Sequence, residues 1–265
     1  WIAALAITEP SGGSDVAALQ TTARRDGDCY VVNGEKTFIT SGMRADVYTV
    51  AVRTDPGAKG ARGISLLVIE RDAAGFTRTP LQKMGWWASD TAHLRFDDVC
   101  VPAGNLLGAE GEGFRAIMHN FTAERFSMAA LALGFAWACC GEALEWARQR
   151  RTFGQRLVDH QVVRHRFVDM LAQIEATRAL LEDVAWRLDH EGSADPGVVA
   201  SVCMAKNTAT RTMQFCADAA VQTLGGMGYM RGTKSERIYR EVKVNMIGGG
   251  AEEIMKDLAA RQLGL

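Results

Sequence analysis

Residues 113–149, GFRAIMHNFTAERFSMAALALGFAWACCGEALEWARQ, repeat apolar side chains at the spacing of an α-helix. Positions 117, 121, 124, 128, 131 and 135 follow one another at intervals of three or four residues, so they share one helix face. Five of the six are Ile, Phe, Met or Leu, and the sixth is Glu124. We therefore predict a long helix, with one carboxylate on a face that we expect to be buried.

A carboxylate on a buried helix face needs an explanation. Burying a charged group is costly unless it is paired, protonated or used in chemistry. Glu124 could form an ion pair with a neighbouring arginine, lie on a helix edge that faces a wet cleft, or act as a functional group in an apolar pocket. This stretch alone leaves all three open.

Before residue 108 the chain has the pattern of short strands separated by polar turns. The pair Asn33-Gly34 is typical of a tight hairpin turn, so we expect a hairpin of 29–32 and 35–40. The other expected strands are 4–8, 47–54, 64–71 and 93–102. Regular short strands of this kind predict a small β-barrel or sandwich over residues 1–108.

After residue 108 the period becomes helical, and we expect helices at 113–149, 157–191, 196–224 and 252–262. Four antiparallel helices with short connections make a bundle, which we assign to residues 109–265. The fold class is therefore α+β, with a β domain followed by a four-helix bundle. Because strands and helices do not alternate, a doubly wound dinucleotide fold is not expected.

Composition narrows the function classes. The formal net charge is −1 and no basic block stands alone, which argues against a nucleic-acid partner. The sequence contains no uninterrupted run of about 18 apolar residues, so it gives no indication of a membrane span. The six cysteines form no C-x-x-C pair and the five histidines lie apart, so we expect free thiols and no metal site. The chain begins at Trp1 without an initiator methionine or a targeting signal, as the interior of a longer protein would.

Four glycine- or arginine-rich segments could meet a phosphate or a flat ring: 8–15 (TEPSGGSD), 150–157 (RRTFGQRL), 222–232 (QTLGGMGYMRG) and 246–254 (MIGGGAEEI). Glycines let backbone approach a ligand, and arginine binds pyrophosphate with two parallel hydrogen bonds. Taken singly, each segment is also an ordinary turn, connector or helix cap.

The order of these motifs along the chain resembles that of the acyl-CoA dehydrogenase family over nearly all 265 residues. The resemblance includes NGEK-x-FIT at 33–40, ER at 124–125, R-x-FG at 151–154 and EEI at 252–254. Family members begin with a further helical domain, which this chain lacks. The resemblance implies FAD as cofactor, an acyl-CoA thioester as substrate, and oxidation of its Cα–Cβ bond to the trans-2-enoyl product.

The resemblance also implies a division of labour. A glutamate takes the α-proton, the β-hydrogen passes as hydride to flavin N5, and an electron-transfer flavoprotein receives the electrons. It implies a homodimer or homotetramer in fatty acid β-oxidation, located in the cytoplasm if bacterial or in the mitochondrial matrix if eukaryotic. A flavin monooxygenase-type relative, or a non-catalytic homologue or fragment that binds FAD or nucleic acid, is the alternative.

Site residues follow by matching positions to the family motifs. Cofactor contacts are implied for Leu5, Ile7, Thr8, Ser14, Phe38, Ile39, Thr40, Arg150, Phe153, Gln161, Gln222, Gly225, Gly226, Ala251 and Glu253. Substrate contacts are implied for Ser14, Thr122, Arg125 and Gly249. Contacts to the pyrophosphate and adenosine typically come from the neighbouring subunit, which implies at least a dimer.

The catalytic base is where this sequence departs from many relatives. The glutamate that they carry before the last helix is Gly249 here. The long-chain and isovaleryl branches place that glutamate in the first bundle helix, immediately before an arginine, which here is Glu124 followed by Arg125. The resemblance thus assigns the base to Glu124 and leaves Gly249 its backbone amide, a donor that can polarise a thioester carbonyl.

Overall fold

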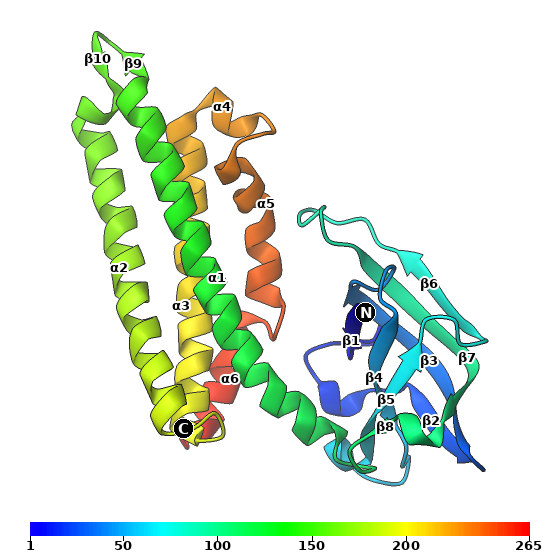
Figure 1. Ribbon diagram of the computed structural model, residues 1–265. Helices are drawn as coiled ribbons and strands as arrows, with labels where there is room; N and C mark the ends of the chain where they lie inside the picture. Colours follow the sequence, from blue (N-terminus) through cyan, green and yellow to red (C-terminus); the bar gives the residue numbers. More distant parts are fainter. The chain divides into compact units, whose positions relative to one another are not determined.

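In the computed structural model, which describes residues 1–265, the large sheet ends at residue 107 and the first α-helix begins at residue 113. The chain separates into two compact units, residues 1–118 and 119–265, so the first turns of α1 (Gly113–Gln149) belong to the first unit. Figure 1 shows the strands of the large sheet in one unit, and the bundle helices with the short β9–β10 hairpin (residues 151–156) in the other. The predicted α+β class is confirmed.

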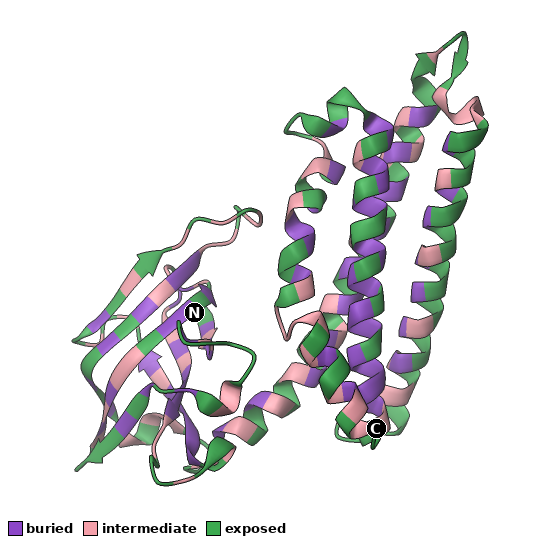
Figure 2. Cartoon of the chain, turned by 180° about the vertical axis from the view of Figure 1, so that it is seen from behind, coloured by how far each residue is buried: buried purple, intermediate pink, exposed green.

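The first unit contains one mixed sheet in the order β6-β7-β3-β2-β4-β5-β8. The strands are β1 (Ala3–Ala6), β2 (Thr22–Asp26), β3 (Cys29–Thr40), β4 (Val47–Arg53), β5 (Ile64–Glu70), β6 (Phe76–Pro80), β7 (Thr91–Pro102) and β8 (Leu106–Leu107). β1 pairs in parallel with β4. Alternate residues of these strands are buried, as Figure 2 shows, because successive side chains point to opposite faces. Tyr48, Phe76 and Phe96 pack ring against ring at the centre of this core.

The predicted hairpin at Asn33-Gly34 was wrong. β3 runs through this pair without turning, and the pairing with β7 shifts by a bulge between Val32 and Gly34. The Asn33 side chain donates to Asp98 Oδ1 and accepts from the Asp98 backbone N–H, both at 2.9 Å. The actual turn is Gly27-Asp28, between β2 and β3, where Gly27 has a φ of 59°. An Asn-Gly pair therefore serves here as a bulge inside one long strand.

The second unit is a bundle of α1, α2, α3 and α5, which share one hydrophobic core. The helices after α1 are α2 (Gln161–His190), α3 (Pro196–Leu224), α4 (Gly226–Tyr229), α5 (Lys234–Ile247) and α6 (Glu252–Gln262). We expected the last helix to complete the bundle, but α5 takes that place. α6 packs instead on the first half of α3, around Cys203 and Met255.

The buried face of α1 is lined by small side chains. It is not the face that carries the large apolar residues at positions 117, 121, 128, 131 and 135. Thr122, Ala129, Ala132, Ala136, Cys139, Ala143 and Ala147 are buried, and Arg125 lies among them. Small residues let α1 lie close to its neighbours, whereas larger ones such as Leu131, 44% exposed, are left at the edge. Of the large stripe only Ile117 is buried, and Glu124 is exposed. Our expectation that Glu124 lies on a buried face was therefore wrong.

By length and composition α1 could also cross a lipid bilayer. The core helix of a bundle passes the same test, and the small residues of α1 lie in one core with α2 and α3.

Candidate functional site

In the first unit, a buried ion pair fixes the loop that follows β1. Lys36 Nζ lies 2.8 Å from Glu9 Oε1 and donates to the carbonyl oxygen of Ile7 at 3.0 Å. Glu9 also accepts from the backbone N–H groups of Gln20 and Thr21. Burial raises the pKa of Glu9, but Lys36 and these hydrogen bonds outweigh it, so that the pKa is lowered overall. Burial lowers the pKa of Lys36 to about 8, although Glu9 opposes the shift.

This anchored loop lies beside the strand that carries Phe38. The backbone N–H of Thr37 donates to the carbonyl of Thr8 at 2.8 Å, which joins the loop to β3. Phe38 has a φ of 60°, in the left-handed region, and lies where the pairing of β3 with β7 shifts. Its ring is 70% exposed, whereas the neighbouring Ile39 is buried. The bulge therefore presents an aromatic ring beside the glycine-rich loop.

The residues assigned to the cofactor in this unit differ in exposure. Ser14, Phe38 and Thr40 are exposed, and Leu5 and Thr8 are half-buried. Ile7 and Ile39 are buried, so their side chains belong to the core. Any ligand contact from those two is limited to the backbone.

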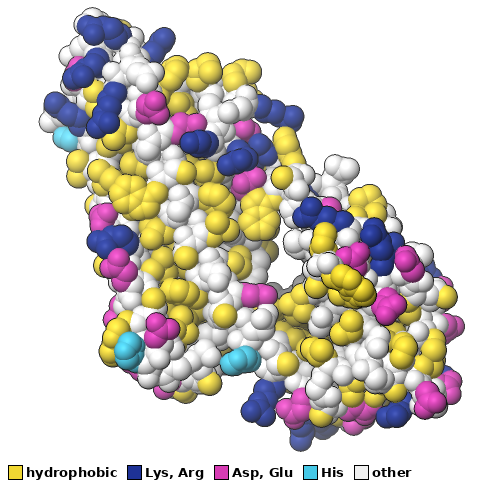
Figure 3. Space-filling view, in the orientation of Figure 1, with side chains coloured by type: hydrophobic (Ala, Val, Ile, Leu, Met, Phe, Trp, Pro, Cys, Tyr) yellow, Lys and Arg dark blue, Asp and Glu magenta, His cyan; other side chains and the backbone are white.

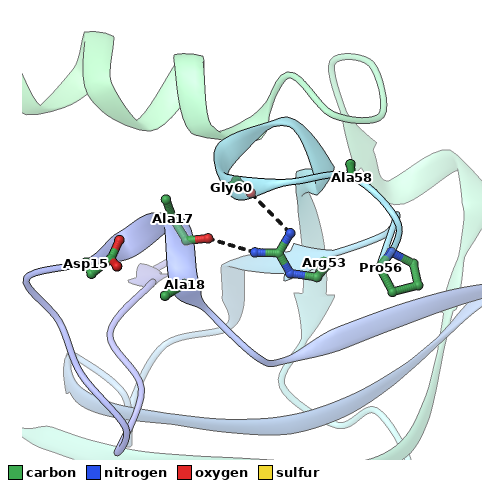
Figure 4. A pocket seen from close by; sticks show the side chains of 7 residues that line it. All are labelled: Asp15, Ala17, Ala18, Arg53, Pro56, Ala58 and Gly60. Atoms are coloured by element: carbon green, nitrogen blue, oxygen red, sulfur yellow. Dashed lines mark hydrogen bonds between the residues drawn. The ribbon is translucent and has the colours of Figure 1, made fainter.

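Sequence reasoning missed an open pocket that begins directly after Ser14. Figure 4 shows its lining, which is Asp15, Ala17, Ala18, Arg53, Pro56, Ala58 and Gly60. The Arg53 guanidinium donates to the carbonyl oxygens of Ala17, Leu19 and Gly60 at 2.8 to 3.2 Å. Arg53 thus joins two loops. Nothing in the composition of 55–63 except its loop character points to this role.

In the second unit, two buried cations hold the glycine loop between α5 and α6. Arg125 Nε, from α1, donates to the Gly249 carbonyl at 2.8 Å. Lys206 Nζ, from α3, donates to the carbonyls of Gly250 at 2.7 Å and Met246 at 3.1 Å. These hydrogen bonds go to backbone oxygens, so two positive charges lie behind the loop without a carboxylate among these acceptors. Sequence reasoning found Arg125 but not Lys206.

Burial is the main influence on both cations. It lowers the pKa of Lys206 to about 8, and the nearby Arg125 adds to this shift. Burial also lowers the pKa of Arg125, against smaller opposing effects of Cys203 and Glu124. The guanidinium carbon of Arg125 lies 5.2 Å from the centre of the Phe121 ring, a cation–π distance.

The glycines of this loop are required by its backbone. Gly249 has a φ of 68° and Gly250 a φ of 114°. A Cβ on Gly249 would lie 3.1 Å from Met128 Sδ, and one on Gly250 would lie 2.4 Å from Met255 Cε. The Gly249 N–H makes no hydrogen bond within the chain. The loop therefore leaves a backbone donor available in front of the two cations.

The loop leads directly into α6, whose first turn adds further free N–H groups. Its N-cap is Ala251, which has no side chain that could accept from them. Glu252 in this turn is paired with Arg211 and Lys256, which hold its pKa at about 2. Glu253 is exposed.

Glu124 is an exposed residue of α1, the helix that contacts this loop through Arg125. Its Oε1 accepts from the Asn120 side chain at 2.8 Å. Met128, one turn further along α1, is in reach of a Cβ on Gly249, and side chains four apart on a helix have Cβ atoms about 5–6 Å apart. Arg125, the next residue, binds the Gly249 carbonyl. The contacts between α1 and the loop thus come from Arg125 and Met128, while Glu124 between them is exposed and Thr122 is buried.

The remaining predicted residues gather at the other end of the bundle. Arg150, Phe153, Gln161, Gln222, Gly225 and Gly226 are all exposed there. Phe153 is 98% exposed, with a φ of 49°, at the tip of the hairpin of β9 (Arg151–Thr152) and β10 (Gln155–Arg156). Arg166 of α2 donates to Thr223 of α3 at 3.1 Å and so joins the two segments. Figure 3 shows Lys and Arg side chains gathered at this end.

The two groups of the bundle are far apart. From Glu124 to the end of α1 at Gln149 the helix rises by about 38 Å at ~1.5 Å per residue. This is longer than an extended dinucleotide, so one bound FAD cannot reach both ends of this helix.

Two family profiles together cover both units of the chain. Residues 4–99 match the profile described as "Acyl-CoA dehydrogenase, middle domain". Residues 111–264 match a second profile, described as "Acyl-CoA dehydrogenase, C-terminal domain". The chain therefore belongs to the acyl-CoA dehydrogenase family.

Individual relatives agree with this assignment. The chain is 36% identical to the mitochondrial isobutyryl-CoA dehydrogenase of Dictyostelium discoideum, over 99% of this chain and 62% of that protein. A putative acyl-CoA dehydrogenase from Mycobacterium smegmatis has a similar structure, with a TM-score of 0.95 and 46% identity over 99% of this chain and 68% of that one. PigA, solved with FAD and proline, has a TM-score of 0.93 and 28% identity, and the match covers 99% of this chain and 68% of PigA. The chain spans only about 60% of the length of the first curated relatives.

Proposed function

We propose that this chain carries the catalytic base of an FAD-dependent acyl-CoA dehydrogenase, and that Glu124 is that base. The observation that carries the proposal is the position of Glu124 on α1 next to Arg125 and one turn before Met128, the two residues of this helix that contact the clamped glycine loop. Glu124 is one residue from Arg125, and Arg125 holds the carbonyl of Gly249, whose own N–H is free. α-Proton removal from a thioester needs such a pair: a carboxylate at the α-carbon and a donor at the carbonyl oxygen.

The residues present fit FAD. Phe38 offers an exposed aromatic face next to a glycine-rich loop, which suits a flat ring. Arg150 and the neighbouring arginines offer charge and hydrogen bonds to a pyrophosphate. FAD, when bound, supplies the acceptor for the β-hydrogen, which leaves as hydride.

The protein's own groups perform the other half of the reaction. Glu124 accepts the α-proton of the thioester. The Gly249 N–H donates to the thioester oxygen, and the charges of Arg125 and Lys206 behind the loop favour the negative charge that develops there. Removing a positioned general base costs about 10²–10⁴-fold in rate.

Oligomerisation follows from the distance along α1. Because about 38 Å separates Glu124 from the end of the helix, the arginine-rich end serves the cofactor of a neighbouring subunit. We therefore propose at least a dimer, with an electron-transfer flavoprotein as the electron acceptor.

The test is Glu124→Gln in the full-length, FAD-loaded protein. We expect the variant to keep its flavin absorbance and to bind acyl-CoA, but to lose bleaching of the flavin by acyl-CoA by at least about 10²-fold. Glu145→Gln is the matched control, because Glu145 is exposed on the same helix and also accepts from a side-chain amide one turn away. Unchanged bleaching in Glu124→Gln would remove the base from this position.

The acyl group that the protein accepts is identified by measuring flavin bleaching with a panel of straight-chain and branched acyl-CoA thioesters, from short to long. A protein that binds FAD but is bleached by none of them would instead fit the non-catalytic or monooxygenase-type alternatives.

A further inference from the structure

Two cysteines of the β unit lie on adjacent strands and on the same face of the sheet. In the antiparallel pairing of β3 with β7, Cys29 is opposite Pro102 and Val31 is opposite Cys100. Residues two apart in a strand point to the same face, so Cys29 and Cys100 are diagonal neighbours on one face. The residue after each cysteine, Tyr30 and Val101, points into the core.

These two thiols are open to solvent. Cys29 is half-exposed and Cys100 is exposed. A hydrogen bond with the Cys100 side chain is the main cause that raises the pKa of Cys29, and burial and Asp26 add to the shift. Cys100 is the more exposed of the two, so an oxidant reaches it first.

The other four cysteines are different. Cys139, Cys140, Cys203 and Cys216 are all buried. Burial raises the pKa of Cys139 and of Cys216 to about 12. The thiolate is the reactive form of cysteine, so these four are protected from oxidants because they are buried and because they stay protonated.

We propose that Cys29 and Cys100 form a redox modification site, which closes to a cross-strand disulfide with hydrogen peroxide as oxidant. The Cys100 thiol loses its proton and its sulfur attacks one peroxide oxygen. The O–O bond breaks, the other oxygen leaves as hydroxide and takes up that proton as water, and Cys100 becomes a sulfenic acid. The Cys29 sulfur then loses its proton and attacks the Cys100 sulfur, displacing a second hydroxide. Two thiols and one peroxide give one disulfide and two waters, and a dithiol reductant reverses the reaction.

The site is independent of the proposed dehydrogenase reaction, because neither cysteine belongs to the glycine loops or to the arginine-rich end. The disulfide would link β3, which also carries Phe38, to the neighbouring strand β7.

The experiment treats the full-length, FAD-loaded protein with one equivalent of hydrogen peroxide. We expect the loss of two of the six thiols, an intact mass lower by two hydrogens, and a peptide that joins Cys29 to Cys100 and is released by dithiothreitol. In Cys29→Ser, Cys100 should stop at a sulfenic acid that dimedone traps, and in Cys100→Ser the dimedone adduct should be lost. Both substitutions lie at the surface, so folding is preserved.

Cys140→Ala serves as the control, because Cys140 is buried, and it should form the same disulfide. Retention of all six thiols, a disulfide between chains, or further oxidation of Cys100 without a Cys29 link would each overturn the proposal.

Discussion

Each unit buries one lysine completely, and the two lysines are held in different ways. Lys36 in the β unit pairs with the carboxylate of Glu9. Lys206 in the bundle donates to the carbonyls of Met246 and Gly250 and has a second cation, Arg125, nearby. Both lysines fix a loop that the family resemblance assigns to the ligands, and burial lowers the pKa of each to about 8.

The two lysines differ in the net charge that they add behind their loops. The pair of Lys36 and Glu9 is neutral overall, so it fixes the loop after β1 without adding a net charge near Phe38. Lys206 and Arg125 donate their hydrogen bonds in this loop to backbone carbonyls, and neither has a carboxylate as a hydrogen-bond partner there. Positive charge behind a loop favours a developing negative charge in front of it, which is what the proposed α-proton removal would require.

The largest expected effect on stability is in the β unit. Glu9→Gln leaves the Lys36 ammonium buried without its counterion, and breaking a buried pair in this way costs about 3–5 kcal/mol. Denaturant unfolding of the full-length protein measures this loss. Glu70→Gln, at an exposed position of the same unit, should change the free energy of unfolding by no more than about 0.5 kcal/mol.

The double variant Glu9→Gln/Lys36→Met sharpens this prediction, because it removes both charges. It should be more stable than Glu9→Gln alone. If the two variants were equally unstable, the loss would come from packing and not from an unpaired charge.

The helices show which parts of the fold were readable from the sequence. The bounds 113–149, 196–224 and 252–262 were correct because apolar period and end signals agree there: the Asp195 side chain caps α3 by accepting from Val198 N–H, and Gly225 ends it. α5 was missed because its sequence is largely polar. Its signal was nevertheless present, since Thr233 caps the helix three residues before Glu236.

The candidate site was readable only in part, because burial depends on which helix face packs. The large residues of α1 appeared to be its buried face, whereas the small ones are buried, and so the exposure of Glu124 was not foreseen. Lys206 gave the same kind of signal as Glu124, a charge in an apolar helix, but its carbonyl partners lie 40 and 44 residues away in sequence. Only the fold brings these groups together.

A smaller stability effect, with a larger effect on rate, is expected in the bundle. Lys206→Met leaves the carbonyls of Met246 and Gly250 without their donor, which costs about 1–3 kcal/mol. Because the glycine loop is loosened and loses one positive charge, kcat should fall while FAD remains bound. Lys243→Met, at an exposed position of α5, is the control. A purely structural role would lower stability without changing kcat in the protein that stays folded.

The last prediction concerns the pH dependence of the unfolding free energy and isolates the contribution of Lys206. Its pKa is lowered by burial from 10.5 to about 8, so between these values the unfolded chain binds more protons than the folded one. Stability from this group therefore rises with pH across that window, by at most about 1.4 kcal/mol per pH unit. Lys36 contributes in the same direction, because its pKa is also about 8. The difference in unfolding free energy between the natural protein and Lys206→Met should thus grow from pH 8 to 10, since the variant lacks one of the two contributions. A constant difference across this range would mean that burial does not lower the pKa of Lys206. The two lysines would then differ only in their hydrogen-bond partners.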